Sequence, residues 1–119
     1  MSAPEPGILI VEDEALIAFV LQMELEKHGY RVCAHVDNGD QAVAATRTSR
    51  PDVVLMDIRI KGPMDGIETA SAIRRVCDQI QIVFITGYGN KEMRTRAAAV
   101  KPIAFLEKPV HIDTLLKYL

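Results

Sequence analysis

The sequence predicts an α/β domain built on a parallel sheet of five strands. Five short apolar runs recur along the chain, and each is followed by a longer stretch of helical character. Strands that alternate with helices are typical of parallel sheets, whose strands are buried on both faces and read as continuous apolar runs. The 119 residues suffice for one such domain with a sizeable core. We therefore expect a single domain over residues 1–119.

The strands are expected where the apolar runs lie. Gly29 stands where a helix ends before the second run, and Pro51 blocks helix just before the third. The five predicted strands are GILIV (7–11), RVCAHV (31–36), DVVLM (52–56), QIVFIT (81–86) and IAFLE (103–107).

The first helix, expected over about residues 14–28, has the clearest apolar pattern. A stripe recurs at helical spacing, formed by Leu16, Phe19, Val20 and Met23. Further apolar residues, Ile17, Leu21 and Leu25, broaden that face. Either a wide buried face or a surface for a partner protein would explain these additional apolar residues.

The other helices differ in how strongly they are anchored. The second (38–49) opens on a turn and cap at Asn38-Gly39-Asp40, and the third (64–75) carries an inward stripe. We expect the fourth (90–100) to be short and weakly anchored, because Met93 and Val100 are its only large apolar residues. Residues expected to pack are Ile67, Ala70 and Ile73 in the third helix, and Ile112, Leu115, Leu116 and Leu119 in the fifth (111–119).

Composition narrows the class of protein. Fourteen Lys and Arg against sixteen Asp and Glu leave a net charge of −2 without a long basic block, which argues against direct nucleic-acid binding. No apolar run reaches transmembrane length, and the N-terminus lacks the features of a signal peptide. Cys33 and Cys77 have no metal-ligand spacing and are expected to be free thiols. A cytoplasmic protein without membrane contact is the expectation.

The informative polar residues all follow the carboxyl ends of predicted strands. Glu12 and Asp13 follow the first strand, Asp57 the third and Lys108 the fifth, while Thr86 closes the fourth. In an open parallel sheet these ends share one edge, where ligands bind. Three acids, a hydroxyl and a cation should therefore meet there.

Such a cluster suits phosphoryl chemistry. Carboxylates that crowd together repel unless a cation neutralises them, and an all-oxygen site suits Mg²⁺. Beside the metal, Asp57 could attack an activated phosphoryl group and become an aspartyl phosphate. Thr86 and Lys108 could contact the transferred oxygens, and the small Gly87 would leave room for them.

These residues make the chain resemble the receiver domain of response regulators in two-component phosphorelay signalling. The motifs LIVEDE, VVLMDIRI, MDGIE, FITGYG and FLEKP occur in the family's order over essentially the whole chain. The resemblance implies a flavodoxin-like (βα)5 sandwich with sheet order 2-1-3-4-5. It also implies that Asp57 takes phosphate from a sensor histidine kinase or phosphotransfer protein. Mg²⁺ would be held by Glu12, Asp13, Asp57 and the backbone carbonyl of Arg59.

The resemblance further implies a switch. Thr86 would move toward the phosphate and Phe105 would swing inward, remodelling the face of the fourth helix, fifth strand and fifth helix for a downstream protein. The family usually holds the bond before Pro109 in cis. FITGYG also resembles a branch of single-domain receivers with a Phe-x-Thr-Gly-Tyr signature. Whether the protein forms a homodimer is left open by the sequence.

Two departures and three alternatives accompany this reading. Lys101-Pro102 replaces the family's common Gly-Ala, and Phe105 stands where many members have tyrosine. Glu12 and Asp13 alone could merely cap a helix. A pseudo-receiver that only binds partners is the rival function; a phosphohydrolase is disfavoured because Arg59 occupies the position of its second acid. We expect a signalling switch with self-catalysed phosphotransfer and autodephosphorylation rather than an enzyme with metabolic turnover.

Overall fold

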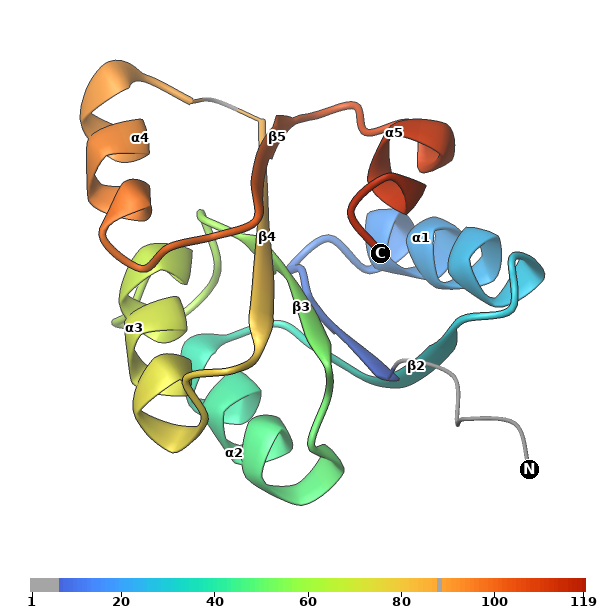
Figure 1. Cartoon of the computed structure of the whole chain (residues 1–119), viewed down its shortest axis with the longest axis horizontal. Coiled ribbons are helices and arrows are strands. Elements are labelled where there is room, and N and C mark those ends of the chain that lie inside the picture. Colours follow the sequence, from blue (N-terminus) through green and yellow to red (C-terminus); the bar gives the residue numbers. More distant parts are fainter. Residues whose placement is uncertain (1–6, 88) are drawn as a thin grey trace.

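Five strands and five helices alternate along the chain in the computed structural model, which describes residues 7–87 and 89–119 (Figure 1). The strands are β1 (Gly7–Val11), β2 (Arg31–Val36), β3 (Val53–Asp57), β4 (Gln81–Thr86) and β5 (Ala104–Glu107). The helices are α1 (Ala15–Lys27), α2 (Gly39–Ser49), α3 (Gly66–Val76), α4 (Lys91–Ala98) and α5 (Ile112–Leu116).

The strands form one parallel sheet in the order β2-β1-β3-β4-β5, which confirms the expected flavodoxin-like topology. The predicted end of the third strand was wrong by one position. Asp57 pairs with Ile85 in the ladder and is the last residue of β3 rather than the residue after it. Its backbone is therefore fixed by the sheet while its side chain stands at the sheet edge.

Alternating strand residues divide the core into two halves. On one side, Leu9, Val54, Met56 and Phe84 pack with the apolar faces of α2 and α3 and with Ala97 of α4. On the other side, Ile8, Ile10, Leu55 and Val83 pack with residues of α1 and α5. This alternation follows from the pleat, which directs successive side chains to opposite faces. The helices accordingly cover both faces of the sheet (Figure 1).

Local sequence signals explain where the helices begin and end. The side chain of Asn38 accepts a hydrogen bond from the backbone of Gln41 and caps α2 as expected. Asn90 caps α4 in the same way. Gly29 follows the end of α1 with a positive φ of 87°, a backbone conformation that glycine adopts without a Cβ penalty.

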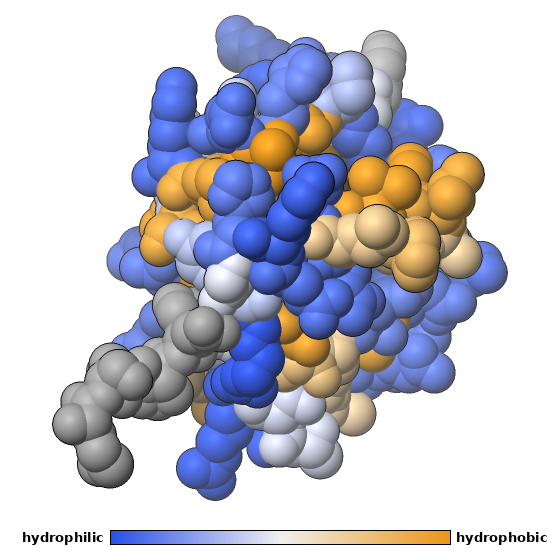
Figure 2. Space-filling view, turned by 90° about the vertical axis from the view of Figure 1, so that its right-hand side faces the viewer, coloured by the Kyte–Doolittle hydropathy of each residue, from blue (hydrophilic) through white to orange (hydrophobic). Residues whose placement is uncertain are grey.

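The apolar stripe of α1 does not face the core, which favours the partner surface among the two alternatives that the sequence left open. The predicted stripe is largely exposed, with exposed fractions of 74% for Leu16, 60% for Phe19, 51% for Val20 and 54% for Met23. Ala18 and Leu25 are the buried residues of the helix. Apolar side chains therefore gather on the surface that α1 and α5 form (Figure 2). The helix turns its smaller residue, Ala18, toward the sheet, and this orientation exposes the stripe.

The last two helices are short. α4 spans eight residues and buries only Ala97, in agreement with the weak anchoring that its sequence predicts. α5 spans five residues and buries Leu115, so it ends earlier than expected. Between α4 and β5, Lys101 adopts a positive φ of 53°, at the position where the sequence departs from the family pattern. None of the helices formed by residues 7–87 and 89–119 is long and apolar enough to cross a membrane.

Candidate phosphoacceptor site

Three acidic side chains meet at the carboxyl end of the sheet. Glu12 and Asp13 follow β1 and Asp57 ends β3, and one carboxylate oxygen of each lies within 4.8 Å of the others. Glu12 and Asp57 are only 4% and 6% exposed, and Asp13 is half-buried. The sheet thus concentrates negative charge where little water reaches it, as the predicted positions implied.

Lys108 supplies the opposite charge. Its Nζ donates to Glu12 Oε1 at 2.7 Å and to Asp57 Oδ2 at 2.8 Å. Burial acts to lower the pKa of the Lys108 ammonium, but the hydrogen bonds and charges of Asp57 and Glu12 outweigh it and raise the pKa above its usual value. Lys108 therefore remains charged and bridges two of the three acids. Its bond to Pro109 is cis, as the family resemblance implied.

Backbone contacts hold the acids in place. The imidazole Nε2 of His35 in β2 donates to the carbonyl oxygen of Glu12 at 2.9 Å, and the backbone N–H of Arg59 donates to Asp57 Oδ1 at 3.2 Å. Gly66 at the start of α3 donates to the carbonyl oxygen of Ile58 at 2.6 Å. A Cβ at position 66 would collide with the carbonyl oxygen of Asp57, so glycine permits α3 to begin against the end of β3.

Glu12 also contributes to the start of α1. Its Oε2 accepts a hydrogen bond from the backbone of Glu14, the residue that precedes the helix. This bond reaches the N-cap residue and not a backbone N–H of the helix's first turn, so it is not the cap that the capping alternative describes. The other oxygen of Glu12, Oε1, binds Lys108, so Glu12 belongs to the acidic cluster.

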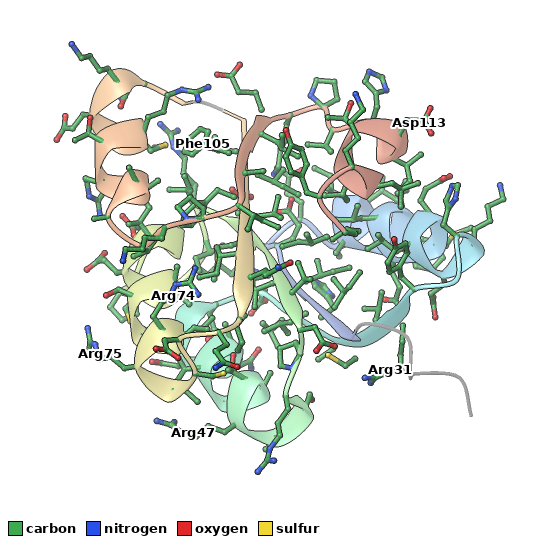
Figure 3. All side chains as sticks on the ribbon, viewed as in Figure 1. Arg31, Arg47, Arg74, Arg75, Phe105 and Asp113 are labelled. Atoms are coloured by element: carbon green, nitrogen blue, oxygen red, sulfur yellow. The ribbon has the colours of Figure 1, made fainter. Side chains whose placement is uncertain are left out.

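Thr86 and Phe105 lie on neighbouring strands near the cluster. Thr86 is fully buried at the end of β4, and its carbonyl oxygen accepts a hydrogen bond from the backbone of Lys108 at 2.8 Å. Phe105 lies on the opposite side of the sheet from α1, 6.2 Å from Phe84 between ring centroids (Figure 3). The structure thus brings Glu12, Asp13, Asp57 and Lys108 into one cluster and places Phe105 outside it.

A groove opens beside the acidic cluster. It has a volume of about 590 Å³ and runs between α1 and the β5–α5 connection, with apolar walls that include Ile17, Val20 and Val110. Asp57 and Lys108 lie at its polar end. The groove therefore leads to the Asp57 carboxylate from the side of α1.

Sequence reasoning missed several residues that support the site. Asp65 and Glu68 form a reciprocal capping box at the start of α3, and Asp65 also pairs with Arg96 of α4 at 2.9 Å. The Asp-x-x-Glu spacing is a sequence signature that could have identified the cap. Nothing local in the sequence indicates the pairing with Arg96, because 31 residues separate the partners.

Comparison with known proteins identifies a family. The family model described as "Response regulator receiver domain" matches residues 8–119. The chain is 34% identical over 111 residues to the transcriptional regulatory protein PdtaR of Mycobacterium tuberculosis, covering 92% of this chain and 52% of that protein. It therefore spans about half the length of that relative. It is 33% identical to sporulation initiation phosphotransferase F of Bacillus subtilis, covering 91% of this chain and 86% of the relative.

Solved structures agree with the fold. The signal receiver domain of a modulated diguanylate cyclase from Desulfovibrio desulfuricans is 43% identical, with a TM-score of 0.90 over 97% of this chain and 90% of that one. A CheY-like receiver domain from Methanospirillum hungatei, 24% identical over 96% and 90% of the two chains, has a TM-score of 0.89 and supports the fold alone. The Phe-x-Thr-Gly-Tyr branch stays a prediction, because these matches identify only the receiver family. Tyr88 of that signature lies outside the described residues.

Proposed function

Because this chain belongs to the receiver domains of response regulators, we propose that it is a phosphoacceptor switch in which Asp57 takes up a phosphoryl group. One observation carries the proposal: Asp57, Glu12 and Lys108 form a hydrogen-bonded charge network at the open edge of the sheet. The relative named sporulation initiation phosphotransferase F supports the same chemistry.

The residues present fit a magnesium ion. Three carboxylates with oxygens within 4.8 Å of one another form a hard, oxygen-only donor set, which Mg²⁺ prefers over softer ligands. Glu12, Asp13 and Asp57 would hold the ion together with the backbone carbonyl of Arg59. When bound, the ion would neutralise part of the acidic charge and polarise phosphoryl oxygens.

In the proposed reaction an Asp57 carboxylate oxygen attacks the phosphorus atom of a phosphohistidine. The O–P bond forms as the N–P bond breaks, and the electron pair stays on the departing imidazole nitrogen. Lys108, which already lies 2.8 Å from Asp57 Oδ2, offsets negative charge on the transferring oxygens. The Thr86 hydroxyl would then hydrogen-bond the attached group, and water would later hydrolyse the acyl phosphate.

The donor would be a sensor histidine kinase or a phosphotransfer protein. Output would pass through the face of α4, β5 and α5, where Phe105 responds to Thr86, to a downstream protein rather than to nucleic acid. The protein would act as a switch that catalyses its own phosphorylation and dephosphorylation. A homodimer of phosphorylated chains is compatible with this output.

The pseudo-receiver alternative lacks support. Such a module would not need the acidic cluster, yet all three acids lie together and Lys108 bridges two of them. It remains useful as the outcome against which the experiment is designed.

Intact mass spectrometry after incubation with acetyl phosphate tests the proposal. We expect a gain of one phosphoryl group that depends on Mg²⁺ and disappears in Asp57→Asn. The matched control is Asp40→Asn at an exposed position of α2, which should take up phosphate like the wild type. Uptake by a folded Asp57→Asn variant, or no uptake by wild-type protein that binds Mg²⁺, would refute the assignment.

A further inference from the structure

Arg74 of α3 makes an unusual set of contacts with two separate loops. Its guanidinium donates to the carbonyl oxygens of Val100 and Lys101, each at 2.9 Å, in the segment between α4 and β5. It also donates to the carbonyl oxygens of Asp78, at 2.9 Å, and Ile80, in the segment between α3 and β4. Figure 3 shows Arg74 lying between α3 and β4, whereas its neighbour Arg75 projects away from the sheet.

These contacts hold the backbone that follows α4. The last carbonyls of the helix already have partners, because residues 96–98 accept hydrogen bonds from the backbone N–H groups of residues 99–101. Val100 and Lys101, whose carbonyls Arg74 binds, lie two and three residues beyond the last residue of the helix, where the helix dipole favours a nearby cation. A guanidinium is well suited to this role because it carries five donors in a rigid fork, so one side chain can bind several carbonyls. Arg74 thus ties the segment between α4 and β5 to α3 and fixes the backbone shortly before β5.

The contacts of the rest of α4 are of a different kind. Arg94 pairs with Glu107 at 3.0 Å, and its guanidinium lies 4.4 Å from the centroid of the Phe105 ring. The side chains of Arg94 and Glu107 are 49% and 56% exposed, so water and salt weaken their attraction. Ala97, the buried residue of the helix, lies near its C-terminal end. The C-terminal end of α4, next to the segment that Arg74 binds, is therefore more firmly held than the N-terminal end.

Phe105 connects this arrangement to the loop after β4. A Cβ on Gly89 would lie 2.9 Å from the Phe105 ring, so the loop backbone passes directly over that side chain. Phe105 is the second residue of β5 and follows closely the segment that Arg74 holds. Movement of the ring would therefore disturb Arg94 and Gly89, while the backbone that carries the ring stays fixed.

We propose that Arg74 is a positioning residue that anchors the C-terminal end of α4 and the start of β5, so that α4 moves as a helix hinged at that end. Arg94 then acts as the releasable contact at the N-terminal half. This inference rests on the proposed phosphoacceptor function for the event that releases the hinge, but the anchor itself exists in the free protein.

Hydrogen exchange in the unphosphorylated protein tests the anchor. In Arg74→Lys, which keeps the charge but loses the fork, we expect the amides of Val100, Lys101 and Ile103 to exchange at least tenfold faster than in the wild type. Amides in the middle of α3 should keep their exchange rates. The control Arg75→Gln removes an exposed arginine one position away and should change none of these rates. Unchanged protection of residues 100–103 in Arg74→Lys would overturn the proposal.

Exchange after acetyl phosphate treatment tests the hinge. In the wild type we expect residues 91–95 to lose protection while residues 100–103 keep it; in Arg74→Lys both segments should exchange quickly. Mass spectrometry of the same samples reports phosphoryl uptake. Absent uptake refutes the proposed function and leaves the result on the free protein to decide the anchor. Uptake with equal loss of protection at both ends of wild-type α4 refutes the hinge.

Discussion

The charge network of Lys108, Glu12 and Asp57 is the most constrained feature at the scale of single residues. Counting side-chain atoms alone, Lys108 is 19% exposed, Glu12 is 5% exposed and Asp57 is 7% exposed. Removing one partner from a buried pair leaves the others without compensation, which is costly. The network that we propose prepares Asp57 for an incoming phosphoryl group therefore also contributes to folding.

Lys108→Met should accordingly destabilise the metal-free protein. By analogy with other buried pairs we expect a loss of about 3–5 kcal/mol in the free energy of unfolding, measured by urea denaturation. The control is Lys61→Met, because Lys61 and Asp37 form an exposed pair at 3.6 Å, for which a change below about 1 kcal/mol is expected. Similar losses in both variants would contradict the importance of burial.

The first helix shows at the scale of elements that an apolar stripe does not by itself reveal which face is buried. Leu16, Phe19, Val20 and Met23 have helical spacing, yet they face water, while Ala18 and Leu25 enter the core. A helix with apolar residues on most of its surface offers several faces to the sheet. Packing against β1, β2 and α5 selects one, which periodicity does not distinguish. The partner-surface alternative for this helix therefore has an exposed patch to support it.

Substitutions in α1 should separate the two faces. Leu25→Ala should lower the free energy of unfolding by about 2–5 kcal/mol, because it removes fully buried methyl groups. Phe19→Gln should change it by no more than about 0.5 kcal/mol, as is usual for exposed positions. Thermal and urea denaturation would measure both. A large destabilisation by Phe19→Gln would mean that the stripe is packed in solution.

The sheet unites distant parts of the chain at the scale of the whole molecule. Glu12 and Lys108 are 96 residues apart in sequence, but Lys108 Nζ lies 2.7 Å from Glu12 Oε1 in the structure. Asp57 ends β3, which lies beside β1 in the sheet, between β1 and β5. The acidic cluster exists only when the sheet is formed. A ligand that binds this cluster therefore binds the folded state and stabilises the entire domain.

Magnesium should raise the melting temperature for this reason. At a free concentration 100 times the dissociation constant, binding to the native state contributes about 2.7 kcal/mol. Asp13→Asn, which changes a half-buried acid of the cluster, should lose most of this effect. Sodium chloride at equal ionic strength controls for screening. An equal rise in the variant would show that the cluster is not the site of the ion.

Features that depend on neighbouring residues were predictable from the sequence. The strands are marked by apolar runs, Asn38 and Gly29 mark helix ends, and the stripe Ile67, Ala70 and Ile73 is buried as expected. The meeting of Glu12, Asp57 and Lys108 also followed, because the ends of parallel strands share one edge of the sheet. Secondary-structure propensity, hydrophobic periodicity and strand direction depend on residues close together in the chain, so they can be inferred from the sequence.

Only the tertiary structure decided the rest. The exposed face of α1, the early end of α5 and the pairing of Arg96 with Asp65 depend on how elements pack. The sequence does not distinguish Arg74 from its neighbour Arg75 on α3. The role of Arg74 depends on backbone carbonyls up to 27 residues away, which two loops bring together. The sequence by itself determined which elements form and which acids meet. Which surfaces are covered and which loops are held together was decided by packing and by hydrogen bonds between distant segments, and these have no local signature.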